Sequence, residues 1–237
     1  MGAQAEVVAD LTGASAATAV TTAVVAVGVG EGVRRLFTSL GVQQVVAGGQ
    51  SMNPSTAQIL EAVEACAAAA VIVLPNNKNI VPVARQVDDL TAKHVEVVST
   101  QSVPEALAAL VEYDPNAACD DNLQGMQDAL TRVRTGEVTQ AVRDSVAVCG
   151  PIATGDWIAI TRDGIEVAVK SVTDAATALL DALVDDDSEL VTIIVGAEAD
   201  ADDTARICDH LAIAHPAVEV EVHPGGQPLY PYLIGVE

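Results

Sequence analysis

The chain has 237 residues, of which half are hydrophobic and only 2% are aromatic. A core built from Ala, Val, Ile and Leu suits buried parallel strands that are covered by helices. The formal net charge of −22 repels phosphate backbones and anionic lipids, so we expect no nucleic acid and no membrane surface as a partner. The longest early apolar run, Ala23–Val29, is too short to cross a bilayer, and we expect no membrane insertion.

The cysteines give no sign of a metal or disulfide framework. Cys66, Cys119, Cys149 and Cys208 form no C-x-x-C pair and no cluster with histidine, which excludes the common zinc patterns. Such cysteines suit a reducing cytoplasm, where we expect the protein, and the amino terminus lacks the basic region of a signal peptide. The histidines form no recognisable catalytic triad. We therefore predict no catalytic residue and no metal site.

The first half of the chain alternates between strand and helix patterns. Residues 1–20 are rich in Ala and Thr without a stable period, and we interpret them as a linker or the remnant of a preceding domain. Capping boxes at Ser55-x-x-Gln58 and Ser102-x-x-Glu105 predict two helix starts. Short loops between strands and helices predict a mostly parallel sheet with helices on both faces, a first α/β lobe over residues 21–115. The predicted strands are Ala23–Val29, Gln43–Val46, Val71–Leu74 and Val95–Val98, and the predicted helices are Glu31–Leu40, Ser55–Ala69, Ile80–Leu90 and 102–112.

The pattern changes in the second half, where short hairpins appear. We expect a long helix over Asp120–Arg134 at the junction and a second, mixed α/β lobe over residues 116–237. Asp163-Gly164 between two apolar runs is a hairpin signature. The strand Val218–Val222 alternates Val with Glu, so one of its faces should be wet. The other predicted elements are strands at Glu137–Val142, Val146–Val148, Trp157–Thr161, Ile165–Val169, Glu189–Val195 and Leu233–Val236, and helices at Val172–Leu183 and up to Leu211.

Two loops of the first lobe follow consecutive predicted strands. Open α/β sheets bind ligands at the carboxyl ends of their strands, and both loops lie there. One loop offers Gly48, Gly49, Gln50, Ser51 and Asn53, and the other offers Asn76, Asn77, Lys78 and Asn79. Neutral amides beside a lysine could hold an anion or a partner's carbonyl groups. The alternative is that these residues are ordinary turn formers and helix caps.

A third loop, in the second lobe, repeats the Gly-Gly-Gln sequence. Gly225, Gly226 and Gln227 precede a Pro-rich segment that contains Tyr230. Tyrosine in an aromatic-poor chain suggests a contact surface, although a rigid connection into the last strand is an equal alternative. Near the start of the chain, Gly28-Val-Gly30-Glu-Gly32 lacks the spacing of a dinucleotide fingerprint. We interpret these glycines as tight-turn residues.

Several of these segments in register resemble one bacterial family. Residues 48–56 (GGQSMNPST), 74–80 (LPNNKNI), 141–144 (AVRD) and 225–232 (GGQPLYPY) are similar to the carboxy-terminal domain of the catalytic subunit of bacterial fatty acid kinase, a dihydroxyacetone-kinase-like protein. The resemblance covers the chain from about residue 24 onward. The loop at residues 50–55 also resembles, more weakly, the ligand loop of DegV-like lipid binders.

The resemblance implies a function for the chain and for its partners. In that family an amino-terminal domain binds ATP and Mg²⁺, and a separate DegV-like protein presents the fatty acid. The resemblance implies that this chain docks the DegV-like fatty-acid-binding protein next to the remaining domains of the parent kinase. It also implies that the chain alone holds no cofactor and is inactive, because no Asp-rich ATP loop is present. The alternative is a small-molecule site, for an acyl chain or phosphate, between the Gly48 and Asn76 loops.

Overall fold

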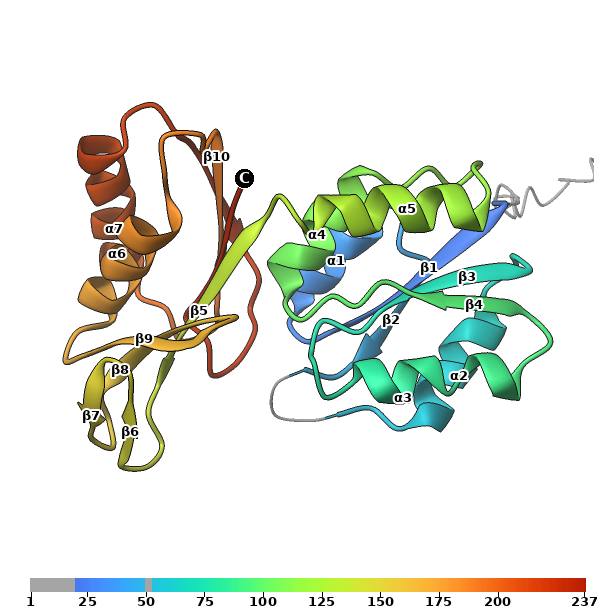
Figure 1. The fold of residues 1–237 in the computed structure, drawn as a ribbon, viewed down its shortest axis with the longest axis horizontal. Helices are drawn as coiled ribbons and strands as arrows, with labels where there is room; N and C mark the ends of the chain where they lie inside the picture. Colours follow the sequence, from blue (N-terminus) through green and yellow to red (C-terminus); the bar gives the residue numbers. More distant parts are fainter. Residues whose placement is uncertain (1–19, 50–52) are drawn as a thin grey trace, which may run out of the picture.

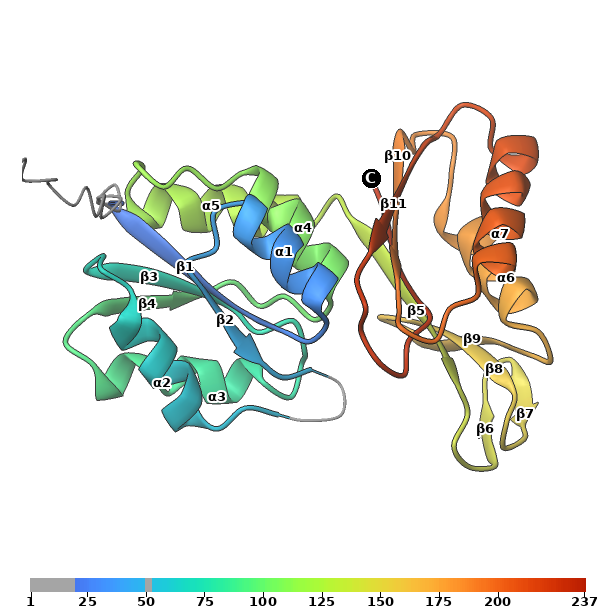
Figure 2. The same cartoon turned by 180° about the vertical axis from the view of Figure 1, so that it is seen from behind.

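The structure, a computed structural model, describes residues 20–49 and 53–237. Figures 1 and 2 show two α/β lobes side by side, joined where β5 leaves the first lobe. The predicted linker, apart from Val20, lies outside the described residues, as do Gln50 and Ser51. None of the described helices is both long enough and apolar enough to cross a membrane.

The first lobe is built on a four-stranded sheet in the order β2-β1-β3-β4. All three strand pairs are parallel, as the strand–helix alternation predicted. Every residue of β1 is buried, because this strand lies inside the sheet and is covered on both faces. The strands are β1 (Thr22–Gly28), β2 (Gln44–Ala47), β3 (Ala70–Leu74) and β4 (His94–Val97).

Helices cover both faces of this sheet, which confirms the predicted architecture (Figures 1 and 2). On β1, Val24 packs in one hydrophobic cluster with Phe37 and Met126, whereas Val25 packs in another with Ile59. One face carries α1 (Glu31–Ser39), α4 (Val103–Val111) and α5 (Cys119–Ala129), and the other carries α2 (Thr56–Ala65), α3 (Val81–Arg85) and the 3-10 turn η1 (Asp88–Leu90).

The helix starts follow from their caps. Ser55 and Gln58 form the predicted capping box of α2. At α4 the Ser102 hydroxyl accepts from the Glu105 N–H at 3.4 Å, but the Glu105 carboxylate accepts from the Gln101 N–H instead of that of Ser102. The predicted helix Ile80–Leu90 is divided into α3 and η1, and the Asp88 carboxylate in η1 accepts from the Val95 N–H of β4 at 3.0 Å.

The helix expected at the junction belongs to the first lobe. α5 ends at Ala129 rather than Arg134, since residues 134–140 already form β5. Met126 of α5 is fully buried against Val24 and Ile72 of the first sheet. Packing therefore places the division between the lobes after α5, and the boundary that we expected at residue 115 separates two helices, α4 and α5, that contact each other.

The second lobe has a mixed six-stranded sheet in the order β11-β10-β12-β5-β8-β9. The Asp163-Gly164 turn joins β8 and β9 as an antiparallel hairpin, as predicted, and β11 is an edge strand with exposed Glu219 and Glu221. The helices α6 (Val172–Leu183) and α7 (Ala201–Ala214) cover one face. The strands are β5 (Arg134–Gln140), β8 (Trp157–Thr161), β9 (Gly164–Val169), β10 (Leu190–Val195), β11 (Glu219–Pro224) and β12 (Tyr232–Val236), with a separate hairpin of β6 (Ser145–Ala147) and β7 (Gly150–Ile152).

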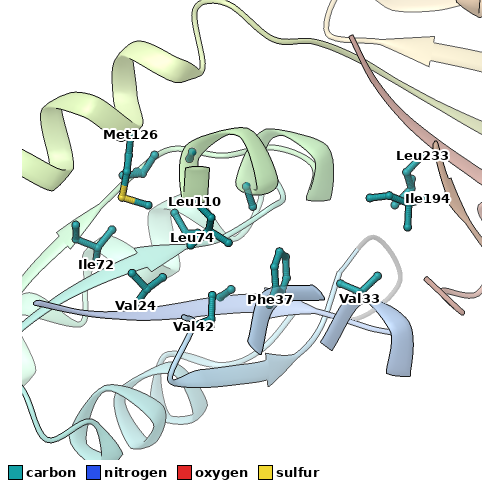
Figure 3. Packing of buried hydrophobic residues seen from close by; sticks show 14 of the residues in the cluster. Val24, Val33, Phe37, Val42, Ile72, Leu74, Leu110, Met126, Ile194 and Leu233 are labelled. Atoms are coloured by element: carbon teal, nitrogen blue, oxygen red, sulfur yellow. The ribbon is translucent and has the colours of Figure 1, made fainter. Parts of the chain in front are cut away.

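The other face of this sheet packs on the first lobe. Ile194 of β10 and Leu233 of β12 belong to the same cluster as Val33 and Phe37 of α1, and Figure 3 shows both on the side of the cluster where Val33 lies. Gly235 of β12 lies directly over α4, where an added Cβ would meet the Pro104 side chain at 3.0 Å. One hydrophobic core therefore runs across both lobes.

Two glycines at the start of α1 permit the closest contact between the lobes. A Cβ at Gly32 would lie 1.6 Å from the Pro224 carbonyl oxygen, and a Cβ at Gly30 would lie 2.5 Å from the Gly225 carbonyl oxygen. The Val33 N–H donates to that same Gly225 oxygen at 3.0 Å. Close backbone approach, in addition to turn geometry, explains the glycines of the Gly28-x-Gly30-x-Gly32 segment.

We expect Gly32→Ala to lower the free energy of unfolding by about 1–3 kcal/mol, because the methyl group forces the Pro224 backbone away from α1. Urea unfolding measures the change. Gly125→Ala is the matched control, since Gly125 is also helical but its Cβ would meet its nearest neighbour at an ordinary 3.5 Å. That variant should gain about 0.5–1 kcal/mol from helix propensity. Equal stability of Gly32→Ala and the unaltered chain would contradict the interlobe contact.

Candidate functional site

The carboxyl edge of the first sheet contains a topological switch point. The chain leaves β1 for β2 on one side and later returns as β3 on the other side of β1. In open α/β sheets, the ends of two such strands diverge and leave a crevice where ligands bind. The ends of β1 and β3, near Gly28 and Asn76, therefore mark the expected place for a site.

A pocket lies at this crevice, between the two lobes. It is a partly open depression rather than an enclosed cavity. Its lining is mostly apolar, with Val27 and Val29 from the first lobe and Leu229 and Leu233 from the second. The predicted site residues Gly48, Gly49, Asn76, Gln227 and Tyr230 also line it. We call it the interlobe pocket.

Asn76 holds the strand ends around this pocket. Its backbone has a φ of 56°, in the left-handed region, and its side chain is buried. The amide nitrogen donates to the Val27 carbonyl oxygen at 2.7 Å, and the amide oxygen accepts from the Thr100 hydroxyl at 2.7 Å. These bonds link the ends of β1 and β3 to the segment after β4, so Asn76 shapes the pocket wall.

Backbone strain occurs twice at this pocket. Leu229, on the opposite lobe, has a φ of 69°, and among the described residues only it and Asn76 are non-glycines with positive φ. Such conformations cost roughly 1–3 kcal/mol each and concentrate at ligand clamps and active sites. The Leu229 carbonyl oxygen accepts from the Thr139 hydroxyl at 2.7 Å, which helps to hold the loop in place.

The remaining residues of the Asn76 loop divide into buried and exposed groups. Asn77 is buried, and its side-chain oxygen accepts from the Asn79 N–H at 2.8 Å. That bond is typical of a turn-forming Asn. Lys78, Asn79 and Asn53 are exposed. The structure therefore leaves these three side chains at the surface, whereas Asn76 and Asn77 are engaged within the fold.

The Gly-Gly-Gln loop of the second lobe forms the other pocket wall. Gln227 is buried, and its amide nitrogen donates to the carbonyl oxygens of Ile194 and Tyr230 at 3.0 and 3.1 Å. Its amide oxygen has no hydrogen-bond partner within the part of the chain that the structure describes. Gly225 and Gly226 lie against the start of α1. The visible contacts of this loop agree with a rigid connection between the lobes, and its role in binding stays a prediction.

A polar cleft adjoins the interlobe pocket and shares Glu137 and Tyr230 with it. Lys78 lines this cleft, together with Arg162 from the β8–β9 turn and Glu105 from α4. The buried Glu105 carboxylate accepts from the Arg162 Nε at 2.9 Å and from the Gln101 N–H at 2.7 Å. Burial and the negative charge of Glu137 raise the pKa of Tyr230 to about 12, so its phenol stays protonated at neutral pH.

The polar cleft contains residues that sequence reasoning missed. The sequence indicates Glu105 only as a helix cap, and Arg162 only as the residue before a hairpin turn. Nothing in the sequence pairs them, because they lie 57 residues apart and meet only when the two lobes pack together. The one feature of the sequence that singled out Glu105 was its place as the single charged residue of α4, Val103–Val111, and nothing in the sequence singled out Arg162.

Comparison with known proteins places this fold in a family. The family model for the C-terminal domain of FakA-like fatty acid kinases matches residues 23–237. An uncharacterized protein of Staphylococcus haemolyticus is 38% identical over 218 residues, which are 92% of this chain but 40% of that protein. The chain thus spans about two fifths of the length of the curated relatives that it matches.

Solved structures share the fold at low sequence identity. A DegV family protein of Corynebacterium glutamicum superposes with a TM-score of 0.65 at 14% identity, over 92% of this chain and 96% of that one. The dihydroxyacetone kinase of C. freundii superposes with a TM-score of 0.61 at 13% sequence identity, and the match covers 91% of this chain and 48% of that one. The fatty acid kinase B3 protein of Streptococcus pneumoniae, loaded with linoleic acid, superposes with a TM-score of 0.60 at 11% sequence identity, and the match covers 92% of this chain and 99% of that one. With residues 23–237 matched by the family model and a dihydroxyacetone-kinase- and DegV-like fold, this chain belongs to the family of FakA-like fatty acid kinase C-terminal domains.

Proposed function

We propose that this chain is the part of a fatty acid kinase that docks a DegV-like fatty-acid-binding protein. The docked partner presents the acyl carboxylate to an ATP- and Mg²⁺-binding part of the kinase that lies outside residues 1–237. There a carboxylate oxygen attacks the γ-phosphorus of ATP, and ADP leaves. The observation that carries the proposal is the match of the fatty acid kinase family model to residues 23–237. The curated relatives that this chain matches are more than twice as long as the chain, which leaves room in them for a separate ATP-binding part.

The charge distribution supports a docking surface at the polar cleft. The sequence has three lysines in a strongly acidic chain. Lys93 donates to the carbonyl oxygens of Val63 and Glu64 at the end of α2, at 2.8 and 3.2 Å, and Lys170 pairs with Asp156. Lys78 is exposed beside Asn79 at the mouth of the cleft. A positive charge on an acidic surface can orient a partner's acidic patch or the group it carries.

A second candidate function is favoured by the interlobe pocket. Its walls are apolar, it lies at the switch point, and two strained residues line it. Apolar walls with a few polar groups are typical of small-ligand sites. The S. pneumoniae protein that shares this fold is loaded with linoleic acid. In this alternative an acyl chain enters the interlobe pocket of this chain itself.

We expect Lys78→Ala to weaken binding of a fatty-acid-loaded DegV-like protein by roughly 1–3 kcal/mol, about 5- to 150-fold in Kd. The physical reason is the loss of the exposed cation at the docking surface. Calorimetric titration measures the affinity, and thermal unfolding should show an unchanged Tm because the residue is exposed.

Lys170→Ala is the control for the loss of one lysine charge. Its side chain is 82% exposed and pairs with Asp156 in the second lobe, among residues that do not line the polar cleft. It should bind the partner as the unaltered chain does. If Lys78→Ala and Lys170→Ala keep the same affinity as the unaltered chain, Lys78 does not belong to the docking surface.

A substitution at Gly49 distinguishes between the two candidate functions. A Cβ added there would meet the Val29 side chain at an ordinary 3.6 Å, so a methyl group fits at this position. Because Gly49 lines the interlobe pocket, a longer side chain would compete with a ligand for the pocket space. If the pocket takes an acyl chain, we expect Gly49→Leu to weaken fatty-acid binding by at least about tenfold, since one misplaced methylene in an apolar pocket costs about 1–3 kcal/mol.

Titration of the chain with a fluorescent long-chain fatty acid measures this affinity. Gly49→Ala is the matched control, because it adds only the methyl group for which there is room, and it should bind much more tightly than Gly49→Leu. No saturable binding by the unaltered chain would reject the acyl pocket and leave the docking function alone. Saturable binding that Gly49→Leu leaves unchanged would place the fatty acid elsewhere.

A further inference from the structure

Three side chains on the outer helices of the second lobe converge on one point. The His210 Nε2 lies 2.7 Å from the Asp181 Oδ1, and the His215 Nε2 lies 2.9 Å from the same oxygen. One potential ligand atom from each residue lies within 4.8 Å of the other two. Asp181 is on α6, His210 is on α7, and His215 is the C-terminal cap residue of α7.

We propose that Asp181, His210 and His215 bind one divalent transition-metal ion of the zinc class. Two imidazole nitrogens and one carboxylate oxygen suit Zn²⁺ and similar ions, whereas Mg²⁺ and Ca²⁺ select sites made of oxygen ligands. This site lies in the second lobe, and its residues do not line the interlobe pocket or the polar cleft. It is therefore a site distinct from the one proposed for docking.

The spacing of the three groups is compatible with a single metal centre. Ligand atoms about 2.0–2.1 Å from a tetrahedral metal lie about 3.3 Å from each other. The two nitrogen–oxygen distances, 2.7 and 2.9 Å, are shorter than this by about 0.6 and 0.4 Å. Side-chain rotation of the half-exposed Asp181 is enough to open that space.

Accessibility and charge favour an ion at this point. The side chains of His210, His215 and Asp181 are 30%, 21% and 50% exposed, so an ion can enter from solvent and keep water as a further ligand. The formal net charge of −22 raises the local concentration of cations at the surface.

Such an ion would fasten α6 to the end of α7. His215 is fixed at the helix end, where its N–H donates to the Leu211 carbonyl oxygen at 2.8 Å. The chain then continues into β11 and the Pro224–Gly225 segment, which contacts α1 of the first lobe. A metal here would stabilise the helical layer that supports this interlobe segment.

The sequence alone predicted no metal site, and the spacing explains why. Asp181 lies 29 residues before His210 and 34 before His215. The two histidines are five residues apart, which fits neither the i, i+4 pair of a metal-binding helix nor a loop motif. His215 reaches the site only because α7 ends there and the cap residue leaves helical geometry, with φ −129° and ψ 59°.

Calorimetric titration of metal-free protein with Zn²⁺ tests the proposal. We expect one ion to bind per chain. Asp181→Asn and His210→Gln should each weaken that binding by more than about tenfold, since even the loss of an outer partner of a ligand costs 10- to 100-fold. The matched control is the double variant His94→Gln/His223→Gln, whose histidines each pair with a single glutamate. It should bind Zn²⁺ as the unaltered chain does.

Thermal unfolding separates a metal site from a hydrogen-bonded histidine pair. Asp181→Asn keeps an oxygen acceptor for a histidine but lacks the negative charge, so its metal-free form should fold. Zn²⁺ should raise the Tm of the unaltered chain and of the control, but not that of Asp181→Asn. Equal Zn²⁺ affinity in all variants, or full competition by an equal concentration of Mg²⁺, would overturn the proposal.

Discussion

The structure depends on a close backbone contact between Gly30–Gly32, at the start of α1, and the segment Pro224–Gln227. No side chain larger than hydrogen fits at Gly32, because the Pro224 carbonyl oxygen occupies the place of its Cβ. This contact holds the Gly-Gly-Gln loop over the carboxyl edge of the first sheet. Both the interlobe pocket and the polar cleft exist because the second lobe is fixed at that edge. Gly30 and Gly32, which we interpreted as tight-turn residues, therefore fix the position of the second lobe that forms one wall of the site.

Local sequence signals predicted most helices and strands of the fold. The placement of elements that depends on packing between distant residues could not be predicted from them. Buried β-branched runs such as 22–28 and the Ser55–Gln58 capping box specify strands and helix starts within a few residues of sequence. The placement of α5 could not be predicted in this way. Its amphipathic pattern fits a helix between the two lobes as well as a helix that packs on the first sheet. Only the burial of Met126 against β1 and β3 shows that α5 packs on the first sheet.

The candidate site was predictable in position but not in the role of each side chain. The rule that loops at the carboxyl ends of parallel strands form sites brought Gly48, Gly49 and Asn76 together at the interlobe pocket. Asn76 and Gln227, however, use their amides to hold backbone carbonyls inside the fold. Sequence gives the chemical groups of an amide, whereas burial decides whether a partner can reach them. The pairing of Glu105 with Arg162 needs both lobes and had no local signal.

The second sheet explains why the two lobes act as one frame. Adjacent residues of its central strands point to opposite faces: Ile193 and Tyr232 pack under α6 and α7, while Ile194 and Leu233 pack on the first lobe. Separation of the lobes would expose Ile194 and Leu233 to water, at a cost of about 1.5–3 kcal/mol for each buried aliphatic side chain. Rigid-body motion of one lobe is therefore opposed by the same core that stabilises each sheet. Lys78 from one lobe and Arg162 from the other line the polar cleft in a fixed relation. In the proposed docking, such preorganisation would lower the entropy cost of binding.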